Sequence, residues 1–130
     1  DAFCLQGVWL CGICCCPPNN EIHKTALGAE LTVDWRYFEN TLDAVKALHE
    51  DGYTIYAIEQ AHGSTMLNDL KLPHNQKTAI IMGHEVFGVQ QEVVDAANGC
   101  IEIPQYGTKH SLNVSVTAGI VMYELSNMLR

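Results

Sequence analysis

The sequence predicts an α/β fold: a mostly parallel sheet with helices on both of its faces. Short apolar runs typical of buried strands alternate with helical patterns along the chain. The last two of these runs, at 79–82 and 100–103, each lead into a loop that contains glycine, and the second loop precedes the longest helical segment. Because ligands bind outside the carboxyl ends of the strands in open α/β sheets, both loops are candidate ligand loops.

The first half of the chain predicts three strands and two helices. Strands are expected at 7–14, 31–37 and 53–58, and helices at 21–27 and 41–50. The first helix is expected to end at Gly28. The second is amphipathic, with Thr41 as its expected N-cap and Gly52 as its stop. A polar loop at 59–64 then leads into a connection that extends to about residue 76.

The second half predicts a short helix at 90–97 between the two glycine loops and a long helix at 111–129. The long helix has almost no polar stripe, and a helix that is apolar nearly all round is buried on both sides. One side is therefore expected to pack on the sheet and the other on a second copy of the chain, with Leu125 on the face between copies.

Length and charge limit the possible functions. A chain of 130 residues is expected to form a single domain over 1–130, and its hydrophobic content of 48% argues against disorder. No apolar run approaches the roughly 20 residues that span a bilayer, and no signal peptide is recognisable, so a cytoplasmic protein without membrane contact is expected. The net charge of −8 argues against strong nucleic-acid binding by this chain alone.

The six cysteines and three loop histidines do not predict a metal site. Cys11 and Cys14 have the C-x-x-C spacing, but no second pair follows, as a structural zinc site requires. They also lie in a strand pattern, whereas a redox C-x-x-C opens a helix. Reduced and mostly buried thiols are expected for the cluster from Cys11 to Cys16, with adventitious metal binding and redox chemistry as alternatives. His62, His84 and His110 lie in candidate ligand loops but share no short-spaced metal motif.

The two glycine loops suggest a ligand site without fixing the ligand. The loop from Gly83 to Gly88 is not a dinucleotide fingerprint, because Glu85 stands where that motif has its middle glycine. It is either a structural turn or a ligand loop. Ser111 and Asn113 stand at the start of the long helix, where free N–H groups and the helix dipole favour anionic or oxygen-rich groups. Ser111 is alternatively a simple N-cap.

Two segments, 80–89 and 101–125, resemble motifs of one enzyme family. Gly83-x-Glu85-x-x-Gly88 matches its second motif; Ile103-Pro104, Gly107 and the run from Ser111 to Ser115 match its third. On these residues the chain resembles the SpoU (TrmH-like) RNA methyltransferases of the SPOUT superfamily. The segments 24–30 and 56–60 look like the middle of that family, so the resemblance covers nearly the whole chain.

The resemblance implies a deep trefoil knot at the C-terminal end, which binds S-adenosylmethionine and forms a homodimer. It implies transfer of the methyl group to a ribose 2′-hydroxyl of tRNA or rRNA. Glu85, Ser111 and Asn113 match the polar residues of the family's catalytic centre. The residues that the resemblance implies for the cofactor site are Glu59, Gln60, Gly83, Gly88, Ile103, Gly107 and Leu112.

The chain also departs from the family pattern. The first motif, an asparagine followed by an arginine, would stand just before Asp1, so a chain truncated at its N-terminus is expected. His84 stands where many relatives have asparagine. Two alternatives to the enzyme therefore remain: a catalytically inactive cofactor- or RNA-binding module of the same fold, and an unrelated α/β nucleotide-binding protein.

Overall fold

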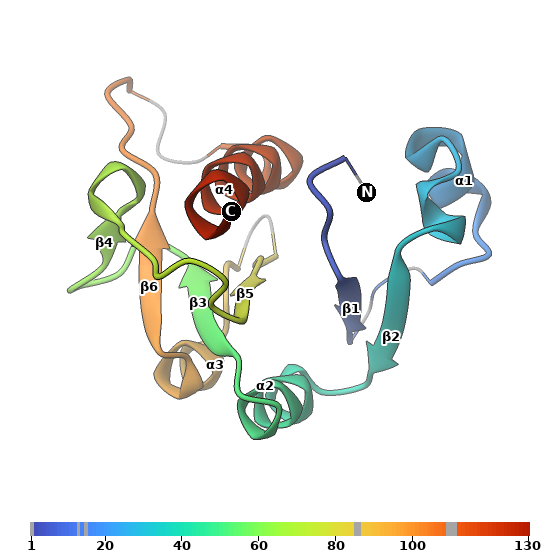
Figure 1. The fold of residues 1–130 in the computed structure, drawn as a ribbon, viewed down its shortest axis with the longest axis horizontal. Helices are drawn as coiled ribbons and strands as arrows, with labels where there is room; N and C mark the ends of the chain where they lie inside the picture. Colours follow the sequence, from blue (N-terminus) through green and yellow to red (C-terminus); the bar gives the residue numbers. More distant parts are fainter. Residues whose placement is uncertain (1, 13, 15, 85–86, 109–111) are drawn as a thin grey trace. The chain divides into compact units, whose positions relative to one another are not determined.

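A computed structural model of the chain describes residues 2–12, 14, 16–84, 87–108 and 112–130, apart from the side chain of Thr25 (Figure 1). Contacts divide the chain into two compact units, residues 1–44 and 45–130, and each unit has its own sheet. None of the described helices combines the length and the apolar character that crossing a membrane requires.

The first unit is built on two parallel strands, β1 (Gly7–Cys11) and β2 (Asp34–Phe38). β1 ends at Cys11 and not at the predicted residue 14, because Gly12 turns the backbone with a φ of +67°. β2 begins three residues later than predicted because a 3-10 turn, η1 (Ala29–Leu31), takes up the start of the predicted strand.

Helix α1 (Asn20–Ala26) connects the two strands and has clear signals at both ends. The Oδ1 atom of Asn19 accepts a hydrogen bond from the backbone N–H of Glu21 at 2.9 Å, which satisfies a donor that the first turn leaves free. After the helix, Leu27 and Gly28 both have positive φ, at 54° and 92°. These two left-handed residues end α1, as the glycine at position 28 predicted.

The second unit contains a four-stranded sheet of β3 (Thr54–Ile58), β4 (Thr65–Met66), β5 (Thr78–Ile81) and β6 (Gly99–Glu102). The strand order is β4-β6-β3-β5, and every neighbouring pair is parallel. The prediction of a parallel α/β sheet is therefore confirmed. β4 and the following 3-10 turn η2 (Leu67–Asp69) lie where the sequence predicted only a loop and a connection.

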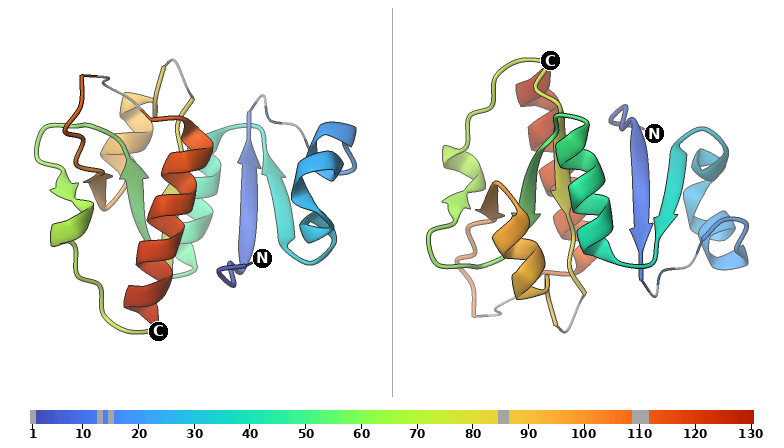
Figure 2. Two further views of the ribbon diagram at one scale, coloured as in Figure 1. Left: turned by 90° about the horizontal axis from the view of Figure 1, so that it is seen from above. Right: turned by 90° about the horizontal axis from the view of Figure 1, so that it is seen from below.

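Helices lie on both faces of this sheet (Figures 1 and 2). α4 (Val114–Leu129) covers one face, and α3 (Gln91–Ala96) lies on the other with the end of α2 (Thr41–Glu50). α2 has the predicted bounds but not the predicted cap. The Oδ1 atom of Asn40 accepts a hydrogen bond from Leu42 N–H at 3.0 Å, so Asn40 and not Thr41 caps the helix.

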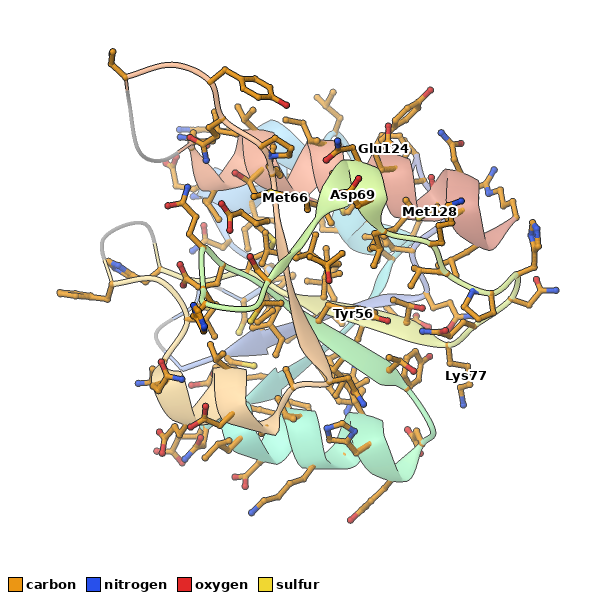
Figure 3. All side chains as sticks on the ribbon, turned by 90° about the vertical axis from the view of Figure 1, so that its left-hand side faces the viewer. Tyr56, Met66, Asp69, Lys77, Glu124 and Met128 are labelled. Carbon is orange, nitrogen blue, oxygen red and sulfur yellow. The ribbon has the colours of Figure 1, made fainter. Side chains whose placement is uncertain are left out.

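The second unit has buried side chains on both faces of its sheet. Ile55 and Ala57 of β3 are fully buried and point away from α4, because they alternate with Tyr56 and Ile58, and Ile101 of β6 is fully buried on the α4 side. Leu67 of η2 and Val121 and Leu125 of α4 pack with Ile101 in one cluster. Tyr56 and Met128, both labelled in Figure 3, are partly buried against that cluster.

One side of α4 is buried on the sheet, as predicted, and the packing of its other side on a second copy of the chain stays a prediction. Val116, Ile120 and Tyr123 are 51%, 38% and 53% exposed, and their helical spacing puts them on one face. We call these three residues the α4 stripe. Leu125 was expected on the face between copies. That placement is wrong, because Leu125 is only 5% exposed and belongs to the core.

Candidate functional site

The carboxyl ends of β3, β5 and β6 meet at one edge of the four-stranded sheet because the strands are parallel. The segments that leave these strands, together with the start of α4, surround a cavity of about 290 Å³. This volume lies near the lower end of the usual range for small-molecule sites, about 300–1,000 Å³. The lining residues are Ile58, Glu59, Gln60, Met82, Gly83, His84, Gly88, Ile101, Glu102, Ile103, Gln105, Leu112, Val114 and Thr117.

The loop after β5 forms one wall and is closed on itself by backbone hydrogen bonds. His84 N–H donates to Gly88 O at 3.1 Å, and Gly88 N–H donates to His84 O at 2.8 Å. A Cβ atom at Gly83 would overlap the backbone of Gly88 and Val89. Gly88 has a φ of +68°, and a Cβ atom there would overlap the carboxylate of Glu59. Gly83 therefore needs glycine for packing against backbone, and Gly88 needs it for its backbone conformation, while a Cβ atom at Gly88 would displace the carboxylate of Glu59.

Glu59, the first residue after β3, fixes this loop. Its Oε2 atom accepts a hydrogen bond from Val89 N–H at 2.8 Å, and its Oε1 atom accepts one from Gln60 N–H at 3.3 Å. Its own N–H donates to Ile101 O at 3.1 Å, which extends the contact between β3 and β6. Glu59 was predicted as a cofactor residue; in this structure its carboxylate lines the cavity and anchors the loop that forms the wall.

A second acidic residue, Glu102 at the end of β6, also lines the cavity. Its Oε1 atom accepts a hydrogen bond from the hydroxyl of Ser64 at 2.7 Å. No lysine or arginine is among the lining residues that the structure describes. Two acidic residues, with no lysine or arginine among the described lining residues, favour a ligand with positive charge at this site.

The N-terminus of α4 forms another part of the wall through Val114 and Thr117. Asn113 caps this helix, since its Oδ1 atom accepts a hydrogen bond from Ser115 N–H at 2.8 Å. Its backbone carbonyl accepts one from Thr117 N–H at 2.9 Å. The sequence left open whether Ser111 is the cap. Ser111 lies outside the described residues, and Asn113 provides the cap in the structure.

Six of the residues predicted to bind the cofactor line this one cavity: Glu59, Gln60, Gly83, Gly88, Ile103 and Leu112. Gly107, also predicted, is not among the lining residues. Of the three predicted catalytic residues, Asn113 stands between the lining residues Leu112 and Val114. Glu85 and Ser111 lie outside the described residues.

Sequence reasoning missed several lining residues, and the reason differs between them. Ile58, Met82 and Ile101 come from the strands or their ends, so a more exact strand boundary would have found them. Glu102 carries a stronger signal, because it is a charged residue inside an apolar strand. Val114 and Thr117 could be predicted as lining residues only from the rotation of the helix that begins after Asn113, and the sequence does not determine that rotation.

None of the described cysteines is among the residues that line this cavity. Cys4 and Cys14 are exposed, Cys11, Cys16 and Cys100 are partly buried, and none of these five forms a disulfide. The prediction of mostly buried thiols is therefore wrong for the described cysteines. Burial raises the pKa of Cys100, and the nearby Glu59 carboxylate raises it further. Within the described part of the chain, no group of three or more His, Cys, Asp or Glu side chains is arranged to hold a metal ion.

A parallel sheet that carries a cavity between two glycine loops and a helix start defines an α/β domain with a small-molecule site at its carboxyl edge. Comparison with protein families narrows this class. The chain belongs to the SpoU rRNA Methylase family, whose model matches residues 1–123.

Curated relatives have names that agree with this family. The chain is 38% identical over 104 residues to a tRNA (guanosine(18)-2'-O)-methyltransferase of Borreliella burgdorferi, which covers 80% of this chain and 47% of the relative. It is 31% identical over 102 residues to an enzyme of the same name from Thermus thermophilus, covering 78% of this chain and 52% of the relative. The chain thus spans about half the length of these relatives.

Solved structures share the fold. The AdoMet-bound rRNA methyltransferase from Sinorhizobium meliloti superposes with a TM-score of 0.90 at 25% identity, covering 99% of this chain and 48% of that protein. The TrmH/SpoU tRNA modifying enzyme of A. aeolicus superposes with a TM-score of 0.73 at 28% identity, covering 82% of this chain and 53% of that protein.

Proposed function

We propose that this chain acts in S-adenosylmethionine-dependent methyl transfer to a ribose 2′-hydroxyl of tRNA or rRNA. The observation that carries the proposal is the cavity at the carboxyl edge of the sheet, which two glycine loops and the start of α4 enclose. Family membership and the names of the curated relatives support the reaction, and the AdoMet-bound neighbour supports the cofactor. These names favour the enzyme over an inactive binding module.

The lining fits S-adenosylmethionine in its chemistry. The cofactor carries a sulfonium and an ammonium group, and the carboxylates of Glu59 and Glu102 supply negative charge on the wall. Apolar side chains of Ile58, Ile103 and Leu112 provide surface for an adenine ring. Backbone groups beside Gly83 and Ile103, beyond the last strand residues, are available to recognise the edge of the base.

When bound, the cofactor supplies an activated methyl group on its sulfonium sulfur. The residues of the chain would then position the ribose oxygen in line with that methyl group, and such positioning supplies much of the rate. Asn113 holds the start of α4 through its cap, and we assign it a catalytic role together with Glu85 and Ser111. Gly107 and the six lining residues named above form the cofactor site in this proposal.

The proposal also includes the knot, the domain, the dimer and the RNA partner. The segment from β5 onward forms the trefoil knot of the SPOUT fold, and all 130 residues belong to one methyltransferase domain. Two copies of the chain pair through the α4 stripe, whose exposed apolar side chains at Val116, Ile120 and Tyr123 suit such an interface. The RNA partner is a tRNA or an rRNA.

Two measurements on the same sample test this function. Calorimetric titration with S-adenosylmethionine should give micromolar binding. Incubation with radiolabelled cofactor and unfractionated tRNA or rRNA, followed by nuclease digestion, should release 2′-O-methylated nucleosides. A folded chain that binds no cofactor would contradict the assignment of the cavity, and binding without transfer would favour the inactive module.

A further inference from the structure

Two large aromatic side chains project into solvent from the loops that form the cavity wall. Phe87 is 83% exposed and Tyr106 is 92% exposed. Phe87 stands between the lining residues His84 and Gly88, and Tyr106 directly follows the lining residue Gln105. Full burial of a phenyl ring typically stabilises a protein by about 1.5–3 kcal/mol, so leaving both rings in water forgoes a substantial gain.

The ring of Phe87 projects from a loop whose two ends are joined by hydrogen bonds. The paired hydrogen bonds between His84 and Gly88 close the loop around it, and Glu59 holds the next residue, Val89. The imidazole ring of His84 stacks on the phenyl ring, with centroids 5.0 Å apart and planes at 29°. One face of Phe87 is therefore covered by a neighbouring ring, while most of the side chain remains accessible. Such a pre-ordered flat surface suits a planar ligand, because little side-chain entropy is lost on binding.

The charge of the chain makes aromatic contacts more important for an RNA ligand. Seven Lys and Arg residues stand against fifteen Asp and Glu, so contacts between phosphates and basic side chains are few. Stacking of a nucleobase on an aromatic side chain does not depend on net charge and accepts any base. Recognition of RNA commonly relies on unstacked bases held on Phe, Tyr, Trp or His.

We propose that Phe87, with His84 stacked on it, and Tyr106 are stacking platforms for RNA bases next to the ribose that is methylated. This inference rests on the proposed function and deepens it, since it names the part of the RNA that the rim of the cavity binds. It requires that the bases next to the target nucleotide be unpaired, or become unpaired on binding. The substrate class is thus a loop or single-stranded segment and not a continuous duplex.

A second copy of the chain is the other possible partner for these rings, and the surface pattern disfavours it. Interfaces between copies bury continuous apolar area, and the α4 stripe provides such a run of neighbouring side chains. In the sequence Tyr106 stands between Gln105 and Gly107, and Phe87 between Val86 and Gly88, so a glycine follows each ring. Single rings separated in this way match individual bases better than a protein face.

The test uses the 130-residue chain and a single-stranded RNA decamer that carries 2-aminopurine, whose fluorescence is quenched when it stacks. Phe87→Leu and Tyr106→Leu remove the aromatic ring and keep an apolar side chain. Each should weaken RNA binding about 5- to 100-fold and reduce the quench, as expected for the loss of one stacked base. Phe87→Trp should restore both. Leu31→Ala changes an exposed leucine of η1 outside the cavity and is the matched control with unchanged binding.

Three results would overturn the proposal. The first is wild-type binding and quench in both leucine variants, and the second is no binding of the decamer by the wild-type chain. The third is a change in the mass of the leucine variants by light scattering with no change in their RNA affinity. The last result would assign the rings to contact between copies. Calorimetry with S-adenosylmethionine separates this proposal from the proposed function. Both leucine variants should bind the cofactor as the wild type does, and a wild-type chain that binds RNA but no cofactor would contradict only the proposed function.

Discussion

The carboxylate of Glu59 accepts a hydrogen bond from the backbone N–H of Val89, with Oε2 and N 2.8 Å apart. This bond joins the residue after β3 to the end of the glycine loop, 30 residues further along the chain. Gly88 lies so close to the same carboxylate that a side chain at this position would displace it. One wall of the cavity therefore depends on three residues from two segments.

Replacing Glu59 by alanine should loosen this wall. The backbone N–H of Val89 would lose its partner, and a lost hydrogen bond to a charged acceptor costs about 1–3 kcal/mol in the free energy of unfolding. Affinity for S-adenosylmethionine should fall as well. Glu59→Gln should cost less, because the amide oxygen still accepts one bond. Urea denaturation and calorimetry measure both effects.

Glu124→Ala is the matched control for this change. Glu124 is exposed on α4 (Figure 3), and its replacement should alter the free energy of unfolding by no more than about 0.5 kcal/mol. If Glu59→Ala behaved like Glu124→Ala in both measurements, the anchoring role of the carboxylate would be wrong.

Three glycine-to-alanine variants should differ in sign and size. Gly88→Ala combines a positive φ with overlap against Glu59 and should lower the free energy of unfolding by at least about 2 kcal/mol. Gly63→Ala carries only the strain of its positive φ, because no atom lies within 4 Å of the new Cβ, and should cost about 1–2 kcal/mol. Gly119→Ala, in open space within α4, should raise stability by about 0.5–1 kcal/mol. Equal losses at Gly88 and Gly63 would mean that the contact with Glu59 does not matter.

The glycine loop also shows how much of the fold and of the site could be predicted from the sequence. The apolar runs and their glycine ends predicted the parallel strands and the edge where the cavity lies, because hydrophobic patterning depends on local sequence. The sequence could not predict the partner of Val89, since the bond to Glu59 joins segments far apart in the chain. It also could not show that Val121 lies in the core and Ile120 in solvent. Both residues are apolar, so only the rotation of α4 about its axis decides which of them is buried.

The α4 stripe should determine whether two chains associate. Ile120→Lys places a charge in the middle of the stripe and should shift a dimer to the monomer, with the mass by light scattering falling by half and the circular dichroism unchanged. Leu125→Asp, by contrast, should unfold the second unit, because Leu125 is packed in the core. A dimer that persists in a folded Ile120→Lys variant would place the interface elsewhere.

At a given pH, the thiol of Cys100 should react more slowly than a thiol with an ordinary pKa. Burial, followed by the charge of Glu59, raises its pKa above the ordinary thiol value, so the folded state holds this proton more tightly than the unfolded state. Its contribution to stability is therefore complete below the ordinary thiol pKa and is lost as the pH rises through the raised value. At pH 8, iodoacetamide should alkylate Cys100 more slowly than the exposed Cys4, as measured by mass spectrometry of peptides. The difference should disappear in urea, and equal rates in the folded chain would contradict the shift.

Glu102 should make the cavity sensitive to the charge of its ligand. S-adenosylmethionine carries a positive sulfonium, whereas the product S-adenosylhomocysteine has a neutral sulfur, so a carboxylate on the wall favours the substrate cofactor. Glu102→Gln should lower the ratio of product Kd to cofactor Kd about three- to tenfold, a modest effect because the cavity is open to screening water. Ser64→Ala keeps the charge and removes only the 2.7 Å hydrogen bond that orients it, so the ratio should change less. Glu124→Gln removes one negative charge from a residue that does not line the cavity and controls for net charge. If calorimetry gave the same ratio for Glu102→Gln and Glu124→Gln, Glu102 would not interact with the sulfonium. Glu59 would then be the remaining acidic residue among the described lining residues that could favour the charged cofactor.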